Sequence, residues 1–328
     1  FLSFMNTPII KAKKSSKEIN FYTEQDYSTW KDAVDQKGWS IKYFKGLGTS
    51  TAREFKQYFD DKMMISFEHT GDNCVNAIDL AFNKKRADDR KTWLRNYDKN
   101  DIMNIKSGNV TYVDWVNKEL SHFSKYDCDR SIPNLVDGNK ISTRKIIYGA
   151  FKRNLVKEIK VAQLVGYISE KSGYHHGEKS LVGAITGMAA EYVGNNNISL
   201  FVPSGQFGTR LAGGTDHASE RYIFTCLNPI TKVIYREEDS YILNYMDDDG
   251  DAVEPEYYIP IIPMVCVNGG KGIGTGFSTD IPCFNVNQVI KYIEYRITGK
   301  GYKPTIEPYY EDFKGSITKI TDHKYLVK

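Results

Sequence analysis

Residues 203–225, PSGQFGTRLAGGTDHASERYIFT, join a glycine-rich loop to a tyrosine that begins an apolar-alternating stretch. Glycines let a backbone approach a ligand closely, and Arg210 places a cation in the loop. A phenol is a poor nucleophile at neutral pH because its pKa is about 10. A cation beside it, as Arg221 stands beside Tyr222, favours the phenolate and can also hold a phosphate. The segment is therefore a candidate site for attack on a phosphodiester.

A plainer interpretation of the same segment is a surface loop that leads into a strand, with Tyr222 packed at a sheet edge. The spacing of the residues by itself favours this plainer interpretation. The glycines concerned are Gly205, Gly208, Gly213 and Gly214.

The bulk properties describe a globular chain. Its 328 residues, 41% hydrophobic and 26% charged, are typical of soluble proteins and predict two or three domains. No run reaches the ~18 apolar residues of a membrane helix. The first residues lack an initiator Met and a basic region, and Asn6 and Pro8 interrupt the apolar stretch, so we expect no secretion signal. Five scattered cysteines without a zinc spacing indicate free thiols in a reducing compartment.

Positive charge is concentrated in one part of the chain. The formal net charge is only +3, but residues 130–180 hold ten Lys and Arg against four Asp and Glu. Such a stretch suits phosphate binding, although a charge run is more commonly a solvated helix face.

A second phosphate-binding candidate lies near the start of the chain. Residues 39–44 alternate as a strand and end at the glycine turn of residues 45–48. Thr49 or Ser50 is then expected to cap a helix over residues 51–59, with Glu54 in its first turn. A strand, a glycine turn and a capped helix present backbone N–H groups to a phosphate. An ordinary strand-to-helix connection has the same pattern.

The middle of the chain has the pattern of a helix-turn-helix followed by a β wing. Three helices are expected over residues 142–151, 160–169 and 179–193, the second and third from the spacing of their apolar residues. Strands are expected over residues 199–203, 222–227 and 232–235.

Three other motifs have simpler interpretations. The acidic run 247–251 does not fit a calcium loop, and we interpret it as a solvated turn. Residues 174–178 contain adjacent histidines that do not point the same way, which disfavours a metal site. The glycines of residues 269–276 do not fit a phosphate-binding P-loop, because Lys271 precedes most of them. Ile273 within them is either buried in a turn or an apolar wedge for DNA.

Five blocks of the sequence resemble the eukaryotic-type DNA topoisomerase II family, the type IIA enzymes. They occur in the family's order and reach nearly from one end of the chain to the other. The blocks are KYFKGLGTSTA (42–52), RSIPNLVDGNKISTRK (130–145), KVAQLVGYISEKSGYHHGEKSL (160–181), QFGTRLAGG with ASERYIFT (206–225) and EPEYYIPIIPMVCVNGGKGIGTGFS (254–278).

The resemblance implies a mixed α+β, multidomain fold. Residues 1–73 would be the C-terminal part of a TOPRIM α/β domain and residues 74–122 a helical connector. Residues 123–262 would be a winged-helix, catabolite-activator-like domain that carries the tyrosine, and residues 263–328 the beginning of an α/β tower domain. The chain is then expected to be a piece of a longer enzyme.

The resemblance also implies an activity. Tyr222, assisted by Arg221, would join the DNA 5′-phosphate during transient double-strand cleavage, ATP-dependent strand passage and religation. DNA contacts would come from Lys45, Gly46, Arg130, Asp137, Lys140, Arg144, His176, Gln206, Arg210 and Ile273, with Asp137 in an orienting role. The family commonly has Gly-Leu-Lys-Pro where this chain has Gly138-Asn139-Lys140-Ile141, and the loss of the proline leaves the turn that precedes Arg144 less fixed.

Cofactors and partners follow from the same resemblance. The family binds Mg²⁺ through TOPRIM carboxylates upstream of this chain, so no metal ligand is expected in it. No ATPase motif is present, and ATP would bind elsewhere. The intact enzyme would be a nuclear homodimer acting on double-stranded DNA, and the chain by itself would not cleave DNA.

Two rival functions remain open. One is a DNA-binding module without chemistry, which would explain the basic stretch and does not need Tyr222. The other is a tyrosine recombinase or type IB topoisomerase, which joins the 3′-phosphate; the order of the blocks argues against it.

Overall fold

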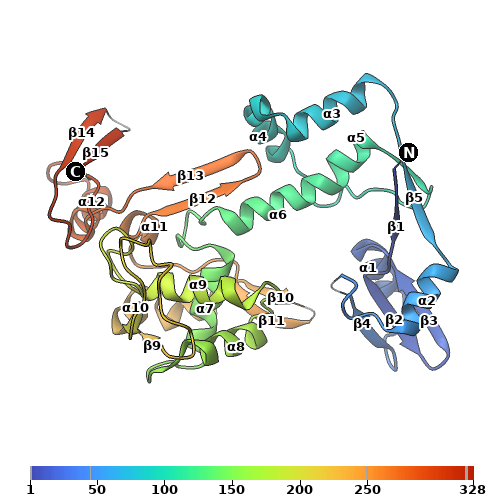
Figure 1. Cartoon of the computed structure of the whole chain (residues 1–328), viewed down its shortest axis with the longest axis horizontal. Coiled ribbons are helices and arrows are strands. Elements are labelled where there is room, and N and C mark those ends of the chain that lie inside the picture. The colour runs from blue at the N-terminus through green and yellow to red at the C-terminus, as the bar shows by residue number, and fades with distance from the viewer. Residues whose placement is uncertain (1, 45, 249, 322–323) are drawn as a thin grey trace. The chain divides into compact units, whose positions relative to one another are not determined.

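The computed structural model describes residues 2–44, 46–248, 250–321 and 324–328 (Figure 1). The chain divides into two compact units, one ending at Phe123 and the other beginning at Ser124. Each unit mixes helices and strands, so the expected mixed α and β class is confirmed. The domain boundaries given above remain predictions.

Two three-stranded sheets form the first unit. β2 (Ile10–Lys14) lies between β3 (Lys17–Phe21) and β4 (Ser40–Tyr43), and β5 (Met63–Glu68) lies between β1 (Ser3–Asn6) and β6 (Asn109–Thr111). Ile10, Ala12 and Phe21 are buried on the first sheet, and Ile65 is fully buried on the second. The helical elements of this unit are α1 (Glu24–Ala33), α2 (Ala52–Asp60), α3 (Asp72–Phe82), η1 (Lys84–Arg86), α4 (Ala87–Arg95), α5 (Tyr112–Trp115) and η2 (Val116–Leu120), and α6 (Ser121–Ser131) runs into the second unit.

The second unit is built on a helical core. α7 (Ile141–Lys152), α8 (Val161–Lys171) and α9 (Glu178–Ala189) lie together (Figure 1) and bury a continuous apolar cluster that includes Ile147, Leu164 and Ile185. The three helices expected from the sequence are therefore confirmed. This unit also contains a small three-stranded sheet, in which the strand order is β7 (Ile159–Lys160), β9 (Phe224–Leu227) and β8 (Phe201–Ser204).

The prediction of a third wing strand over residues 232–235 is wrong. That segment lies in and directly after α10 (Pro229–Ile234), a helix that Asn228 caps by accepting a hydrogen bond from the Ile230 N–H. Proline at the first helical position favours this start. The strand expected to begin at Tyr222 begins instead at Phe224, which leaves Tyr222 in a turn.

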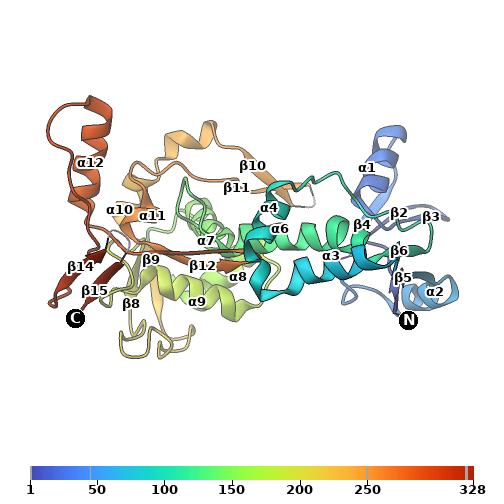
Figure 2. The same cartoon turned by 90° about the horizontal axis from the view of Figure 1, so that it is seen from above.

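After α10, the second unit consists of short helices and two-stranded hairpins (Figure 2). The acidic run expected as a turn does join a hairpin, although Asp249 lies outside the described residues. The elements are η3 (Glu237–Tyr241), β10 (Tyr245–Asp248), β11 (Asp251–Pro255), α11 (Met264–Val267), β12 (Gly270–Gly274), β13 (Phe277–Ile281), α12 (Val286–Thr298), β14 (Ile317–Thr321) and β15 (Lys324–Val327).

Candidate active site and nucleic-acid interface

Tyr222 lies on a turn directly before β9 and is exposed to solvent. Its side chain is 71% exposed, whereas that of the next residue, Ile223, is 1% exposed. The Tyr222 N–H donates to the Ser219 carbonyl across 2.9 Å, which closes the turn. An inward Ile223 next to an outward Tyr222 anchors the turn while the phenol remains accessible.

The start of helix α8 holds the same turn. The N–H of Val161 donates to the Ile223 carbonyl and the N–H of Ala162 to the Glu220 carbonyl, each across 3.0 Å. The first N–H groups of a helix have no partner within it, and here backbone carbonyls on either side of Tyr222 accept two of them. The position of the tyrosine is therefore tied to the helical core.

The glycine-rich loop packs tightly against itself. A Cβ on Gly208 would lie 2.5 Å from the Gly214 Cα, and Gly208 has a φ of +98°, so the loop needs glycine there. The N–H and hydroxyl of Thr209 both donate to the carboxylate of Asp216, each across 2.8 Å. The Ala218 N–H donates to the Gln206 carbonyl across 3.0 Å, which closes the loop near the tyrosine turn.

The polar side chains expected in this region are exposed. The guanidinium carbon of Arg221 lies 5.7 Å from the centre of the Tyr222 ring. Arg210 donates from Nη1 to the Val193 carbonyl across 3.1 Å, and both Arg210 and Gln206 are exposed. Each of these side chains, like that of Tyr222, is therefore accessible to a ligand.

A second group of predicted residues gathers at a cavity of about 240 Å³ in the same unit. Arg130 and His176 both line it, as do Lys145 and Tyr126. Nε2 of His176 lies 3.0 Å from the Tyr126 hydroxyl. Burial, and then the nearby positive charge of Arg130, lower the pKa of His176. The lowered pKa favours the neutral imidazole, which has one hydrogen-bond donor and one acceptor.

Lys145 lines this cavity without having been expected there from the sequence. Its Nζ donates to Oε2 of Glu254 across 2.7 Å and to the Ser172 carbonyl. Both side chains of the ion pair are largely buried. Because Glu254 is 109 residues away along the chain, no local signal in the sequence could have indicated this pair.

Asp137 and Arg144, both expected near the cleaved DNA strand, are buried. Their exposed fractions are 0% and 6%. Nε of Arg144 donates to Oδ2 of Asp137 across 2.8 Å, and the Tyr258 N–H donates to the same oxygen across 3.0 Å. The guanidinium of Arg144 is therefore directed into the fold, and its predicted phosphate contact stays a prediction. Lys140 next to them is half-buried, and burial lowers its pKa.

Ile273 projects from hairpin β12–β13. Its side chain is 75% exposed, which excludes the buried alternative. The glycines on either side face inward: a Cβ on Gly272 would lie 2.0 Å from the Ser131 carbonyl oxygen, and one on Gly274 would lie 3.0 Å from Cys128. Alternation of Gly with larger residues lets one face of the hairpin lie flat against residues 128–133 while Ile273 faces outward.

The turn after β4 lies in the first unit. Gly46 has a φ of +71°, and a Cβ there would meet no atom within 4 Å, so this part of the backbone is open. Lys45, predicted beside it as a DNA contact, lies outside the described residues. The helix after the turn begins at Ala52 and is capped by Thr51, one or two residues later than expected.

The residues that the structure describes do not fit a magnesium site. Among them, no three or more His, Cys, Asp or Glu side chains gather where they could hold a metal ion. In the acidic hairpin turn, Asp248 lies 3.0 Å from His175 and Asp247 accepts from the Gly250 N–H. No described helix is long and apolar enough to cross a membrane.

Comparisons with known proteins cover the whole chain. The family of the DNA gyrase/topoisomerase IV A-subunit matches residues 130–328, and the C-terminal associated domain of TOPRIM matches residues 5–128. A crystal structure of the Plasmodium falciparum topoisomerase II DNA-binding, cleavage and re-ligation domain matches with a TM-score of 0.87 and 49% identity. The match covers 100% of this chain and 45% of that one.

Curated relatives agree with these matches. The DNA topoisomerase 2 of Plasmodium falciparum (isolate K1 / Thailand) is 51% identical over 97% of this chain and 23% of its own length. The DNA topoisomerase 2-alpha of Mus musculus is 44% identical over 100% of this chain and 22% of its own length. The chain thus spans less than a quarter of these relatives, and the resemblance inferred from the sequence is confirmed. The chain belongs to the type II DNA topoisomerases, in the family of the DNA gyrase/topoisomerase IV A-subunit.

Proposed function

We propose that the chain contributes the DNA-cleaving and rejoining tyrosine of a type II DNA topoisomerase, and that Tyr222 is this nucleophile. One observation carries the proposal: a tyrosine residue that is 71% exposed lies on a turn fixed by backbone hydrogen bonds to a helix. Placing a reactive group in a fixed geometry removes much of the entropic barrier to attack.

The chemical step is a transesterification. Tyr222 Oη attacks a backbone phosphorus, so that an Oη–P bond forms while the P–O3′ bond breaks. The phenolic proton passes to solvent, and the departing 3′ oxygen takes a proton to become a hydroxyl. The 5′-phosphate then remains on the tyrosine. Because one phosphodiester replaces another, the reverse step reseals the strand without a further energy source.

Arg221 is proposed to stabilise the negative charge that develops on the attacked phosphate. It lies beside the tyrosine ring and is exposed. Charge-assisted hydrogen bonds from a guanidinium to phosphate oxygens are strong and specific in geometry. Its preorganised charge would favour the transition state over the ground state.

Other residues are proposed to bind the duplex. Arg130, Lys140 and Arg210 would contact phosphates, Gln206 and His176 would donate hydrogen bonds to them, and Ile273 would wedge between base pairs. Gly46, with Lys45, would contact DNA through the first unit. Asp137 and Arg144 are proposed to position the segment that carries Lys140, because both are buried against each other.

The activity of the whole protein is proposed from its relatives. ATP-dependent strand passage, relaxation and decatenation would require parts of the protein beyond this chain, as would Mg²⁺, for which the described residues provide no site. A homodimer would make the paired cuts. Eukaryotic relatives named DNA topoisomerase 2 support a location in the nucleus.

The test uses the full-length protein with end-labelled duplex DNA and Mg²⁺, stopped with detergent. Wild type is expected to yield protein joined to 5′ ends, and Tyr222→Phe is expected to bind DNA equally without forming that adduct. Adduct formation by Tyr222→Phe would disprove the assignment of the nucleophile. Tight binding without an adduct in either protein would instead support a non-catalytic DNA-binding module.

A further inference from the structure

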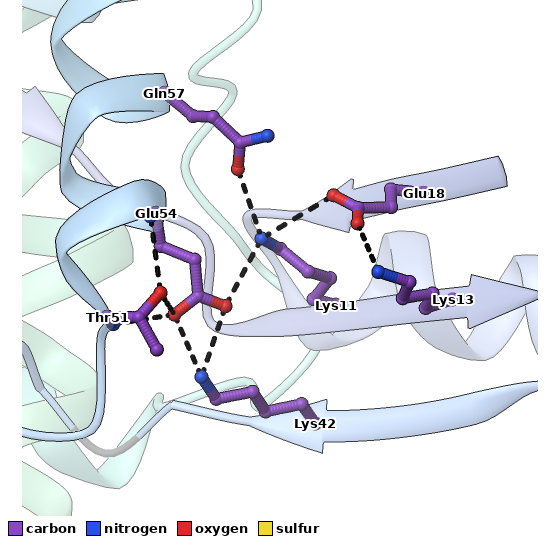
Figure 3. A network of polar contacts seen from close by, with 7 residues as sticks. All are labelled: Lys11, Lys13, Glu18, Lys42, Thr51, Glu54 and Gln57. Atoms are coloured by element: carbon purple, nitrogen blue, oxygen red, sulfur yellow. Dashed lines mark hydrogen bonds and ion pairs between the residues drawn. The ribbon is translucent and has the colours of Figure 1, made fainter. Parts of the chain in front are cut away.

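Glu54 is the centre of a polar network in the first unit (Figure 3). It lies in the first turn of α2, and its carboxylate turns back to the residue that caps the helix. Oε2 accepts from the Thr51 N–H across 2.8 Å and from the Thr51 hydroxyl across 3.0 Å. The Thr51 hydroxyl in turn accepts from the Glu54 N–H. This reciprocal capping box fixes where the helix begins.

Two lysines from the sheet reach the same carboxylate. Lys42 on β4 donates to Oε1 across 3.1 Å and to Oε2 across 2.9 Å. Lys11 on β2 donates to Oε1 across 3.3 Å. The side chains of Lys11 and Glu54 are only 7% and 11% exposed. A buried carboxylate shared by two ammonium groups is strongly committed to its ionised form.

These contacts join the two ends of one loop. Lys42 lies next to the last residue of β4, and Thr51 immediately precedes α2. The loop between them contains the glycine turn, where a Cβ on Gly46 or Gly48 would meet no atom within 4 Å. Within the loop the Ser50 N–H donates to the Leu47 carbonyl across 3.2 Å. Because the two glycines add no packing contact, we expect the contacts at the two ends of the loop to influence where Gly46 and Gly48 lie.

We propose that Glu54 is a positioning residue for DNA binding: its carboxylate ties Lys42 to Thr51 and so holds the backbone of residues 46–48 in its DNA-binding shape. This inference rests on the proposed function, because it takes the turn as a contact of the duplex. Glu54 itself is directed into the fold and does not touch DNA.

The same network offers a matched control. Glu18 on β3 lies 2.9 Å from Lys13 and 3.9 Å from Lys11, and its side chain is 27% exposed. Glu18→Gln removes a carboxylate from the same face of the sheet and changes the net charge equally. None of the contacts described for Glu18 reaches the ends of the loop.

The test measures adduct formation by the full-length protein as a function of DNA concentration, well below the unfolding temperature of every variant. Glu54→Gln is expected to raise the half-saturating DNA concentration about tenfold, while the cleavage rate at saturating DNA stays within about twofold of wild type. Glu18→Gln is expected to leave both quantities unchanged. A loss of folded protein would lower the amplitude of cleavage without moving the half-saturating concentration.

Thr51→Ala supplies a second, uncharged variant, which remains informative if Glu54→Gln does not fold. It removes the hydroxyl from the cap, a change that costs about 1 kcal/mol in other helices, and is expected to raise the half-saturating concentration about threefold. An unchanged half-saturating concentration in Thr51→Ala and in any folded Glu54→Gln would overturn the inference, as would an equal rise in Glu18→Gln. Absence of an adduct from wild type would instead refute the proposed function.

Discussion

Arg144 Nε donates to Asp137 Oδ2 across 2.8 Å, with both side chains buried in the second unit. Asp137 also accepts from the backbone N–H groups of Asn139 and Tyr258. The carboxylate therefore joins the start of α7 to the segment after β11. Lys140 comes directly before α7, so this buried pair sets the backbone from which a proposed phosphate contact projects.

Asp137→Asn is expected to lower the free energy of unfolding of the second unit by about 3–5 kcal/mol, because it leaves a buried guanidinium without a charged partner. Denaturation by urea, followed by circular dichroism, measures the loss. Arg236→Gln is the control: it breaks the pair with Glu238, whose side chains are 57% and 71% exposed, and should change stability by less than about 1 kcal/mol. Similar small losses in both variants would contradict a structural role for the buried pair.

Local patterns in the sequence predicted the helices of the second unit. Apolar spacing located α8 and α9, because burial of one face follows the helical period. Tyr222 and the glycine loop could also be chosen as a candidate site from the sequence, because the residues that suggested the site are neighbours in the chain. The strand expected at residues 232–235 failed because Asn228 and Pro229 start a helix there, a capping signal stronger than the short alternation.

Contacts between distant residues could not be predicted in the same way. Glu54 was expected only as a first-turn residue, and its bonds to Lys42 and Lys11 span 12 and 43 residues. Likewise, the exposure of Ile273 follows from the packing of its flanking glycines on residues 128–133. The ion pair of Arg144 with Asp137 could not be predicted either, because tertiary structure brings the two side chains together.

Gly272→Ala is expected to destabilise the second unit by about 1–3 kcal/mol, the usual cost of overpacking. The new Cβ would lie 2.0 Å from the Ser131 carbonyl oxygen, and backbone on both sides leaves little room to adjust. Thermal unfolding measures the change. Gly183→Ala is the matched control, because a Cβ there would meet no atom within 4 Å and alanine favours the helix that contains it. Equal stability of the two variants would show that the hairpin does not pack as described.

The stability contributed by Glu54 is expected to disappear in acid. Burial by itself would raise its pKa, but hydrogen bonds from Lys42, Thr51 and Lys11 lower the pKa of Glu54 from 4.5 to about 2. Because the pKa is lower in the folded state, the ionised carboxylate stabilises the fold fully at pH values above the unfolded-state pKa of 4.5. This stabilisation is lost as the pH falls from 4.5 toward 2. The shift corresponds to about 3 kcal/mol.

Urea unfolding of wild type and Glu54→Gln between pH 7 and pH 2 measures this contribution. The difference in unfolding free energy should be constant above about pH 5 and should shrink below it. Other carboxylates, including Glu18, are common to both proteins and cancel. A difference that stays constant down to pH 2 would contradict an ionised Glu54 in the network.

Ile273→Ala is expected to reduce the bend of bound DNA without weakening the fold. Apolar wedges kink duplexes by about 20–90°, and Ile273 is 75% exposed on a hairpin whose inward face is formed by glycines. Removing an exposed side chain should change the unfolding free energy by no more than about 0.5 kcal/mol. Energy transfer between dyes at the ends of a short duplex reports the bend, which should decrease by on the order of 20° or more.

Lys271→Ala is the control for the wedge. Lys271 lies on the same outward face of β12, and its side chain is 74% exposed. This variant should weaken DNA binding by an amount that depends on the salt concentration, and it should leave the bend unchanged. If Ile273→Ala bends DNA as wild type does, the wedge lies elsewhere and Ile273 serves only as exposed apolar surface.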